Sequence, residues 1–179
     1  AMARCQLLKL ESLVEQRRYN FNYLAPKIES LPGIEVGKVR ADSVHAHYVF
    51  GGLYKQEILE VHRDRFIEAV RAELPETEGR EGEGAIFSCG YVKPLYLQPL
   101  YQNRIAIGNR GYPFKSLESN SNEVEVDYSL GICPVTESLW KDEFFFHEIF
   151  RPPMSETDLD SVYNAFEKVY ENRQFLKQK

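Results

Sequence analysis

Apolar residues spaced by three, four or seven positions predict a long helix at the start of the chain. They are Leu7, Leu10, Val14, Phe21 and Leu24. Charged residues occupy the opposite face, as in a helix that packs on one side. The pattern covers residues 3–25, and the helix can bend at Pro26 and continue as far as Ser30. The sequence Leu31-Pro32-Gly33 then ends it.

Three stretches favour strands. Residues 34–39 alternate apolar and polar positions, and residues 45–54 are rich in aromatic and β-branched side chains. Within the second stretch, Gly51-Gly52 indicates a bulge or a close approach of another chain segment. Residues 144–150 form a dense aromatic run typical of a central strand. A brief strand is also predicted around residues 124–128.

Two further helices are indicated by period and capping residues. Residues 64–74 place Phe66, Ile67 and Val70 on one face before Pro75. Ser155 precedes a last helix with carboxylates in its first turn and basic residues at its far end. Its apolar face consists of Leu159, Val162, Phe166 and Val169. A short helix near residues 136–139 is expected to include Trp140.

The order of these elements predicts an α+β fold, in which helices cover one face of an antiparallel sheet. Strands follow one another directly, and the helices lie apart from them. Residues 76–84 are acidic and glycine-rich, which predicts a loop or hairpin tip. Residues 103–122 are a long polar connection, which predicts a functional or interface loop.

Composition narrows the class of protein. The 179 residues are 43% hydrophobic, enough for one good-sized core, and carry a net charge of −5. That acidic, mixed charge argues against nucleic-acid binding. No apolar run has the length of a membrane span or the form of a signal peptide. The cysteines Cys5, Cys89 and Cys133 are widely spaced, as expected of reduced thiols in a cytoplasmic protein.

Residues 90–101 combine two prolines, three tyrosines, one lysine and one glutamine. The prolines exclude a regular helix or a central strand across the whole segment. Tyrosines offer apolar faces with polar tips, which suits the wall of a small-molecule site. The alternative is a surface loop whose aromatic residues only pack against the body of the domain.

Common catalytic motifs are absent from the sequence. It contains no GxGxxG, GxxxxGK[ST], GxSxG or HExxH pattern. His45-x-His47 could contribute to a metal site, but no third ligand is near in sequence, so no metal is predicted. A metal enzyme that uses His45, His47 and His62 is the weakest of three functional hypotheses.

Seven motifs in a fixed order carry a family resemblance. They are Gln6-Leu7-x-Lys9-Leu10-Glu11 with Arg17-Arg18 and Asn20; Leu31-Pro32-Gly33-Ile34; His45-x-His47-Tyr48-Val49-Phe50; Arg63-Asp64-Arg65-Phe66-Ile67-Glu68-Ala69; Gly90-Tyr91-x-x-Pro94-Leu95-Tyr96-x-x-Pro99-Leu100; Cys133-Pro134-Val135-Thr136-Glu137; and Arg151-Pro152-Pro153-Met154-x-x-x-Asp158. Together they resemble the C-terminal part of pyridoxal-phosphate-dependent sugar aminotransferases of the DegT/DnrJ/StrS type. The branch that aminates keto-cyclitols such as scyllo-inosose is the most similar.

The resemblance implies a small, C-terminal aminotransferase domain at residues 32–179, preceded by a linking helix at residues 1–31 from a missing large domain. That large domain would carry the Schiff-base lysine and the pyridoxal phosphate site. This chain would then have no catalytic residue, would bind no cofactor alone and would be inactive alone. Expected partners are the large domain, a second copy in a homodimer, a keto-sugar or keto-cyclitol, and an amino donor. Self-association through residues 3–25 is also expected.

By the same resemblance, this chain would wall the substrate cleft. The substrate-contact candidates are Tyr91, Lys93, Tyr96, Gln98 and His147. For His147, a packing role is an equal alternative. Relatives often have a histidine in the 90–101 segment, and its absence here favours the cyclitol branch. The alternative function is a non-enzymatic sugar- or cyclitol-binding or regulatory module with the same fold.

Overall fold

Four short antiparallel strands form one sheet in the order β1-β2-β4-β3. They are β1 (Ile34–Val36), β2 (Phe50–Tyr54), β3 (Phe87–Cys89) and β4 (Phe144–His147). The computed structural model describes residues 2–75, 87–108, 111–115, 126–148, 150 and 152–177. The acidic segment predicted as a loop at 76–84 lies outside these residues, as does much of the loop predicted at 103–122.

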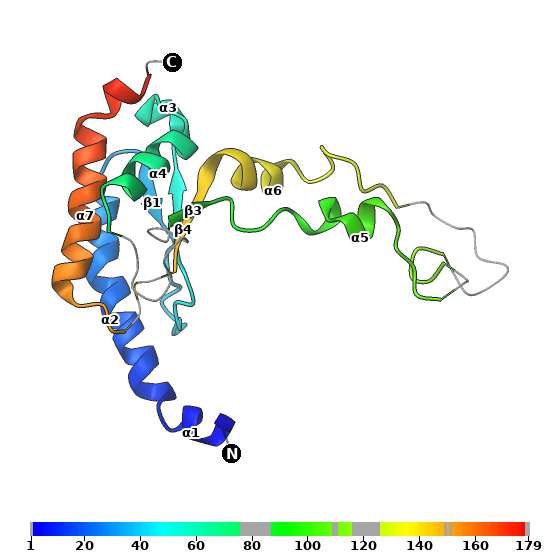
Figure 1. Ribbon diagram of the computed structural model, residues 1–179, viewed down its shortest axis with the longest axis horizontal. Coiled ribbons are helices and arrows are strands. Elements are labelled where there is room, and N and C mark those ends of the chain that lie inside the picture. Colours follow the sequence, from blue (N-terminus) through cyan, green and yellow to red (C-terminus); the bar gives the residue numbers. More distant parts are fainter. Residues whose placement is uncertain are drawn as a thin grey trace.

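Helices cover one face of this sheet (Figure 1). They are α2 (Leu10–Glu29), α4 (Arg63–Ala72) and α7 (Glu156–Glu171). The core of the described residues contains twelve large side chains that are fully or almost fully buried: Leu24, Ile28, Phe50, Tyr54, Leu59, Phe66, Ile67, Phe87, Phe145, Phe150, Leu159 and Phe166. The predicted α+β class with an antiparallel sheet is therefore confirmed.

A long arm leaves the sheet between β3 and β4 and returns to it (Figure 1). On the way out, it contains a 3-10 turn at Leu95–Leu97 and the short helix α5 (Pro99–Gln102). On the way back, it contains α6 (Pro134–Ser138) and one turn of π-helix at Leu139–Glu143. Since β3 and β4 are neighbours in the sheet, both ends of the arm start from the same place.

The smaller elements complete the described chain. Helix α1 (Met2–Leu7) precedes α2, α3 (Gln56–Leu59) follows β2, and a 3-10 turn at Arg173–Lys177 follows α7. No helix among the described residues is long and apolar enough to span a membrane.

The predicted N-terminal helix forms, but not as one apolar face. It is divided into α1 and α2, and α2 continues through Pro26. Phe21 and Leu24 are buried, whereas Leu7 and Leu10 are 66% and 51% exposed. The first half of the predicted face is therefore largely exposed, with only Val14 half-buried, and periodicity alone could not distinguish the two halves.

The bounds of the strands were predicted less accurately than those of the helices. The strand predicted at 45–54 begins only at Phe50, because His47 has φ of 48°, in the left-handed region that an extended strand does not use. The described part of the strand predicted at 124–128 has no strand structure. By contrast, α7 is confirmed with a complete capping box, in which Ser155 and Asp158 bond to each other's backbone N–H.

Gly52 is required by the packing between β2 and β4. It pairs with Phe145, whose fully buried ring lies across the space where a side chain would be. A Cβ atom on Gly52 would lie 2.2 Å from Cζ of Phe145. The close approach expected at Gly51-Gly52 is thus confirmed at Gly52.

We predict that Gly52→Ala lowers the free energy of unfolding by about 1–3 kcal/mol, because the new methyl group forces the Phe145 ring out of its site. Urea denaturation measures the change. Gly37→Ala is the matched control, since a Cβ there meets nothing within 4 Å. Equal urea midpoints for Gly52→Ala and Gly37→Ala would contradict this account of the packing.

Candidate functional site

The face of the sheet opposite the helices carries an aromatic surface. Because side chains alternate along a strand, Phe144 and Phe146 lie on this face while Phe145 faces the core. The Phe144 and Phe146 rings are stacked with centroids 6.2 Å apart. Tyr91 lies edge-on to Phe146 at 4.9 Å. We call these three residues the open-face aromatic cluster.

Tyr91 is the most exposed member of this cluster. Tyr91 is 46% exposed, and a hydrogen bond with the Tyr48 side chain raises its pKa. Tyr48 comes from the loop before β2, so two segments distant in sequence supply neighbouring tyrosine hydroxyls. The surface thus has an apolar floor and polar tips, a combination suited to a polyhydroxylated ligand.

Gly90 fixes the point at which the arm leaves the sheet. Its φ is 73°, and its N–H donates to the Phe144 carbonyl at 2.7 Å. A Cβ atom there would lie 2.3 Å from the carbonyl oxygen of Trp140, in the π-helical turn of the returning half of the arm. Only glycine allows both the positive φ and this close approach.

Arg63 holds the returning end of the arm to the body. Its guanidinium is only 3% exposed. Nη1 donates to the carbonyls of Trp140 and Phe144, each at 3.0 Å, and Nη2 donates to that of Lys141 at 2.6 Å. Nε and Nη2 also bind Asp64 Oδ1, at 2.9 and 2.7 Å. The Arg63 side chain therefore satisfies carbonyls of the π-helical turn, and the Asp64 carboxylate balances the positive charge of the guanidinium.

Glu137 links the outgoing and returning halves of the arm. It is 7% exposed, and its Oε1 accepts hydrogen bonds from the Tyr96 hydroxyl and from the backbone N–H of Gly131, at 2.7 Å. The Tyr96 bond, assisted by backbone N–H groups, lowers the pKa of Glu137. Burial, followed by Glu137, raises the pKa of Tyr96 to about 12.

The other predicted substrate residues differ in environment. Lys93 and Gln98 lie on the outgoing arm, where Gln98 Nε2 donates to the Lys93 carbonyl at 2.9 Å and the Lys93 side chain is exposed. His147 is 3% exposed and stacks on Phe87 at 4.3 Å, on the helix-covered face. The sheet thus separates His147 from Tyr91, and the burial of His147 favours its packing role.

Sequence reasoning assigned no role to Tyr48, Arg63 or Glu137. All three lie within motifs of the resemblance, but their partners are distant: Arg63 contacts residues 139–144, for example. For Arg63, the available signal was a charged residue in a motif with buried apolar positions at Val61 and Phe66. Such a residue is rarely buried without a partner.

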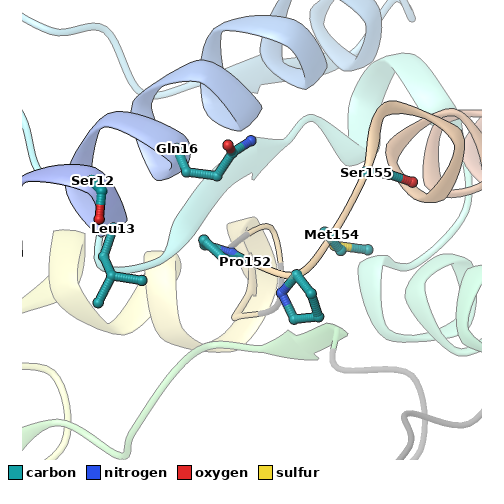
Figure 2. A pocket seen from close by; sticks show the side chains of 7 residues that line it. Ser12, Leu13, Gln16, Pro152, Met154 and Ser155 are labelled. Atoms are coloured by element: carbon teal, nitrogen blue, oxygen red, sulfur yellow. The ribbon is translucent and has the colours of Figure 1, made fainter. Parts of the chain in front are cut away.

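Two hollows lie near the N-terminal helix. The first, of about 450 Å³, lies between α2 and the loop that precedes α7. Figure 2 shows Ser12, Leu13 and Gln16 of α2 on one side and the loop residues Pro152, Met154 and Ser155 on the other. Gln16 also bonds to the buried Asn20, whose Nδ2 donates to the Phe150 carbonyl at 2.6 Å. This hydrogen-bond chain ties the loop to α2.

The second hollow, of about 410 Å³, lies beside the loop between β1 and β2 and is lined partly by His45 and His47. The sequence places this pair on a strand, but both residues lie in the loop before β2. His62 instead caps α4, accepting from the N–H of Asp64. Within the described part of the chain, no three His, Cys, Asp or Glu side chains form a metal-ligand group.

Pyridoxal phosphate needs a lysine that its surroundings desolvate and activate. Every lysine in the described part of the chain is exposed or half-buried. Lys27, one of the half-buried ones, lies 2.5 Å from Asp160 Oδ1, and this hydrogen bond raises its pKa, the opposite of activation. The described residues therefore do not form a site that fits the cofactor.

The fold itself is that of part of an aminotransferase. Solved structures match almost the whole chain, and among them is a DegT DnrJ EryC1 StrS aminotransferase from Brucella abortus, with a TM-score of 0.59 and 20% identity over 92% of this chain and 33% of that one. No family model matches the sequence, and no curated protein matches it.

Two other matches are similar in extent. DesV of S. venezuelae, determined in complex with a ketimine intermediate, has a TM-score of 0.64 and 18% identity over 94% of this chain and 34% of DesV. DesI, determined in the presence of its TDP-sugar product, has a TM-score of 0.60 and 14% identity over 95% of this chain and 34% of DesI. The chain thus spans about a third of the length of the structures it matches.

We predict that Arg63→Met destabilises the protein by about 3–5 kcal/mol, because several buried carbonyls and Asp64 lose their donor. Urea unfolding measures the total effect, and fluorescence of Trp140, the only tryptophan, reports on the arm. Arg71→Met is the matched control, since Arg71 is exposed on the same helix. If both variants unfold like the unmodified chain, Arg63 does not anchor the arm.

The stability of the arm should depend on pH through Glu137. The pKa of Glu137 is lower in the folded chain than its ordinary value of about 4.3, so ionised Glu137 stabilises the arm above that value. This stabilisation is lost as pH falls through the folded pKa. We therefore expect a change in Trp140 fluorescence below about pH 4.3.

Substitutions at Glu137 and Tyr96 test whether Glu137 is the group whose protonation causes this change in fluorescence. Glu137→Gln should remove this acid transition, and Tyr96→Phe should shift its midpoint upward, toward the ordinary glutamate value. An unchanged transition in Glu137→Gln would assign it to another carboxylate.

Proposed function

We propose that this chain is the small domain of a pyridoxal-phosphate-dependent aminotransferase that acts on a keto-sugar or keto-cyclitol, and that it walls the substrate cleft. The observation that carries the proposal is the extent of the fold match. The same fold covers 92–95% of this chain but only 33–34% of the three aminotransferase-like structures. The remaining two-thirds of such an enzyme would supply the reacting groups.

The open-face aromatic cluster and the outgoing arm are the surfaces we assign to the substrate. A sugar or cyclitol ring has apolar C–H faces that pack on aromatic rings and hydroxyls that bond to tyrosine. Tyr91 offers both, and the exposed Lys93 offers a cation to an anionic group. Tyr96 and Gln98 would shape the same wall, with Tyr96 held in place by Glu137.

The cofactor belongs to the proposed large domain. When bound there, pyridoxal phosphate acts as an electron sink for transfer of the amino group. The role of this chain is then to bind the substrate, orient it and exclude water from the cleft. We accordingly assign no catalytic residue to this chain.

The N-terminal segment is the proposed link between the domains, with residues 1–31 as the linker and 32–179 as the small domain. Helix α1, the first half of α2 and the turn between them expose Met2, Leu7, Leu8, Leu10 and Leu13. Apolar residues concentrated in this way mark a contact surface, for the large domain or for a second copy in a homodimer. Free Cys5, Cys89 and Cys133 agree with the proposed cytoplasmic location.

The proposal is tested by mixing the chain with a polypeptide that carries the large domain and assaying transamination of scyllo-inosose and of a keto-sugar nucleotide. The chain alone should show neither activity nor the visible absorbance of lysine-bound pyridoxal phosphate. Activity should require both parts. A cofactor band from the chain alone, or tight binding of a cyclitol without any partner, would instead favour another function.

In the active assembly, Tyr91→Phe and Lys93→Gln should each raise KM for the keto substrate about five- to tenfold, with a smaller effect on kcat, because each removes a substrate hydrogen bond. Lys141→Gln is the matched control, since Lys141 is exposed on the returning arm. Unchanged KM values in both test variants would remove these residues from the substrate site.

A further inference from the structure

The hollow of about 410 Å³ beside the loop between β1 and β2 has the composition of a ligand pocket. Its apolar walls are Phe21, Val39, Val49, Leu53 and Phe144. Its only polar side chains are those of Lys38, His45 and His47. Apolar walls with a few convergent polar groups are typical of small-molecule sites, and the volume lies in their usual range.

His47 is the buried polar group of this pocket. It is 5% exposed, and its ring stacks on Phe21 with centroids 3.7 Å apart. Burial, followed by the charges of His45 and Arg18, lowers its pKa to about 4, so the ring is neutral at pH 7. No described residue forms a hydrogen bond with its ring nitrogens, so these nitrogens are available to a ligand or to water.

The hydrogen bonds of the loop also orient His45. Its Nδ1 accepts the backbone N–H of His47 at 2.9 Å, so in the neutral ring the proton lies on Nε2. The two imidazole centroids are 4.5 Å apart. Each neutral imidazole has one N–H donor, and Lys38 adds a positive charge to the same lining.

The charge around the pocket is unbalanced. Its lining contains no aspartate or glutamate. The one acidic side chain of the loop between β1 and β2, Asp42, is 2.9 Å from Arg40. Arg17 and Arg18 of α2 add further positive charge nearby, with Arg17 3.5 Å from the His47 carbonyl. The lining therefore offers positive charge and N–H donors, and the nearest strand carboxylate is that of Glu35, opposite Leu53.

We propose that this pocket binds a small organic anion, with its carboxylate or phosphate group between Lys38 and the two imidazoles and its apolar body against Phe21 and Phe144. Two N–H donors and an ammonium group provide charge-assisted hydrogen bonds to such a group. The site shares Phe144 with the open-face aromatic cluster, but its polar groups are different ones, Lys38, His45 and His47. The proposal does not depend on the proposed aminotransferase function.

The probes are phenylacetate, phenyl phosphate and the neutral analogue phenylacetamide, each titrated against the full chain. Isothermal titration calorimetry measures affinity, and the ring ¹⁵N signals of His45 and His47 locate the contact. At least one anion should bind about tenfold or more tightly than phenylacetamide, because only the anions form charge-assisted hydrogen bonds with Lys38 and the imidazoles. The two anions distinguish carboxylate from phosphate preference.

Variants at the rim avoid disturbing the core. Val39→Trp should fill the pocket and abolish binding, whereas Val44→Trp, on the same loop but outside the lining, should leave it unchanged. Lys38→Gln should weaken anion binding about fivefold without affecting phenylacetamide, and Lys141→Gln should have no effect.

Three results would overturn the proposal. They are no binding of either anion, equal affinity for phenylacetamide, or anion binding that survives Val39→Trp in a chain with unchanged stability. Anion binding would stand even if the chain never supported transamination, so the two proposals fail separately.

Discussion

The arrangement of this molecule depends on the buried guanidinium of Arg63. An arginine that is 3% exposed would be costly by itself, but its donors are satisfied by Asp64 and by carbonyls of the returning arm. It therefore joins α4, which is part of the core, to a turn of π-helix that leads back into β4. Together with the close contact at Gly90, it determines where the arm begins and ends.

The sheet divides the molecule into two faces with different roles. The helix-covered face holds the core and has little freedom to change, because its rings are almost completely buried. The opposite face carries Phe144, Phe146 and Tyr91, and Tyr91 remains half exposed. The proposed substrate surface lies on this second face and on the arm that starts from it, where side chains are exposed to solvent.

Both polar and aromatic contacts join the two halves of the arm, and the rings of Tyr101, Phe114 and Tyr128 lie against one another. Glu137 links Tyr96 to the returning half, while apolar residues along the arm remain exposed, among them Val92 at 65%, Leu95 at 68% and Val135 at 73%. A segment that cannot bury its own apolar residues is suited to contact with another body. This agrees with the proposed place of the chain as one part of a larger enzyme.

Local patterns in the sequence were sufficient to predict α4, α7 and the α+β class, because period, capping and chain order are local properties. The resemblance found in the motifs agrees with the fold of the solved structures. The motifs could not predict that His47 leaves the strand, that Leu7 and Leu10 stay exposed, or that His147 and Tyr91 lie on opposite faces. Residues 90–101 were predicted as a possible pocket wall, but the partners of Tyr91 and Tyr96 come from residues 48, 137 and 146. Those contacts exist only after distant segments pack together, so tertiary structure alone determines them.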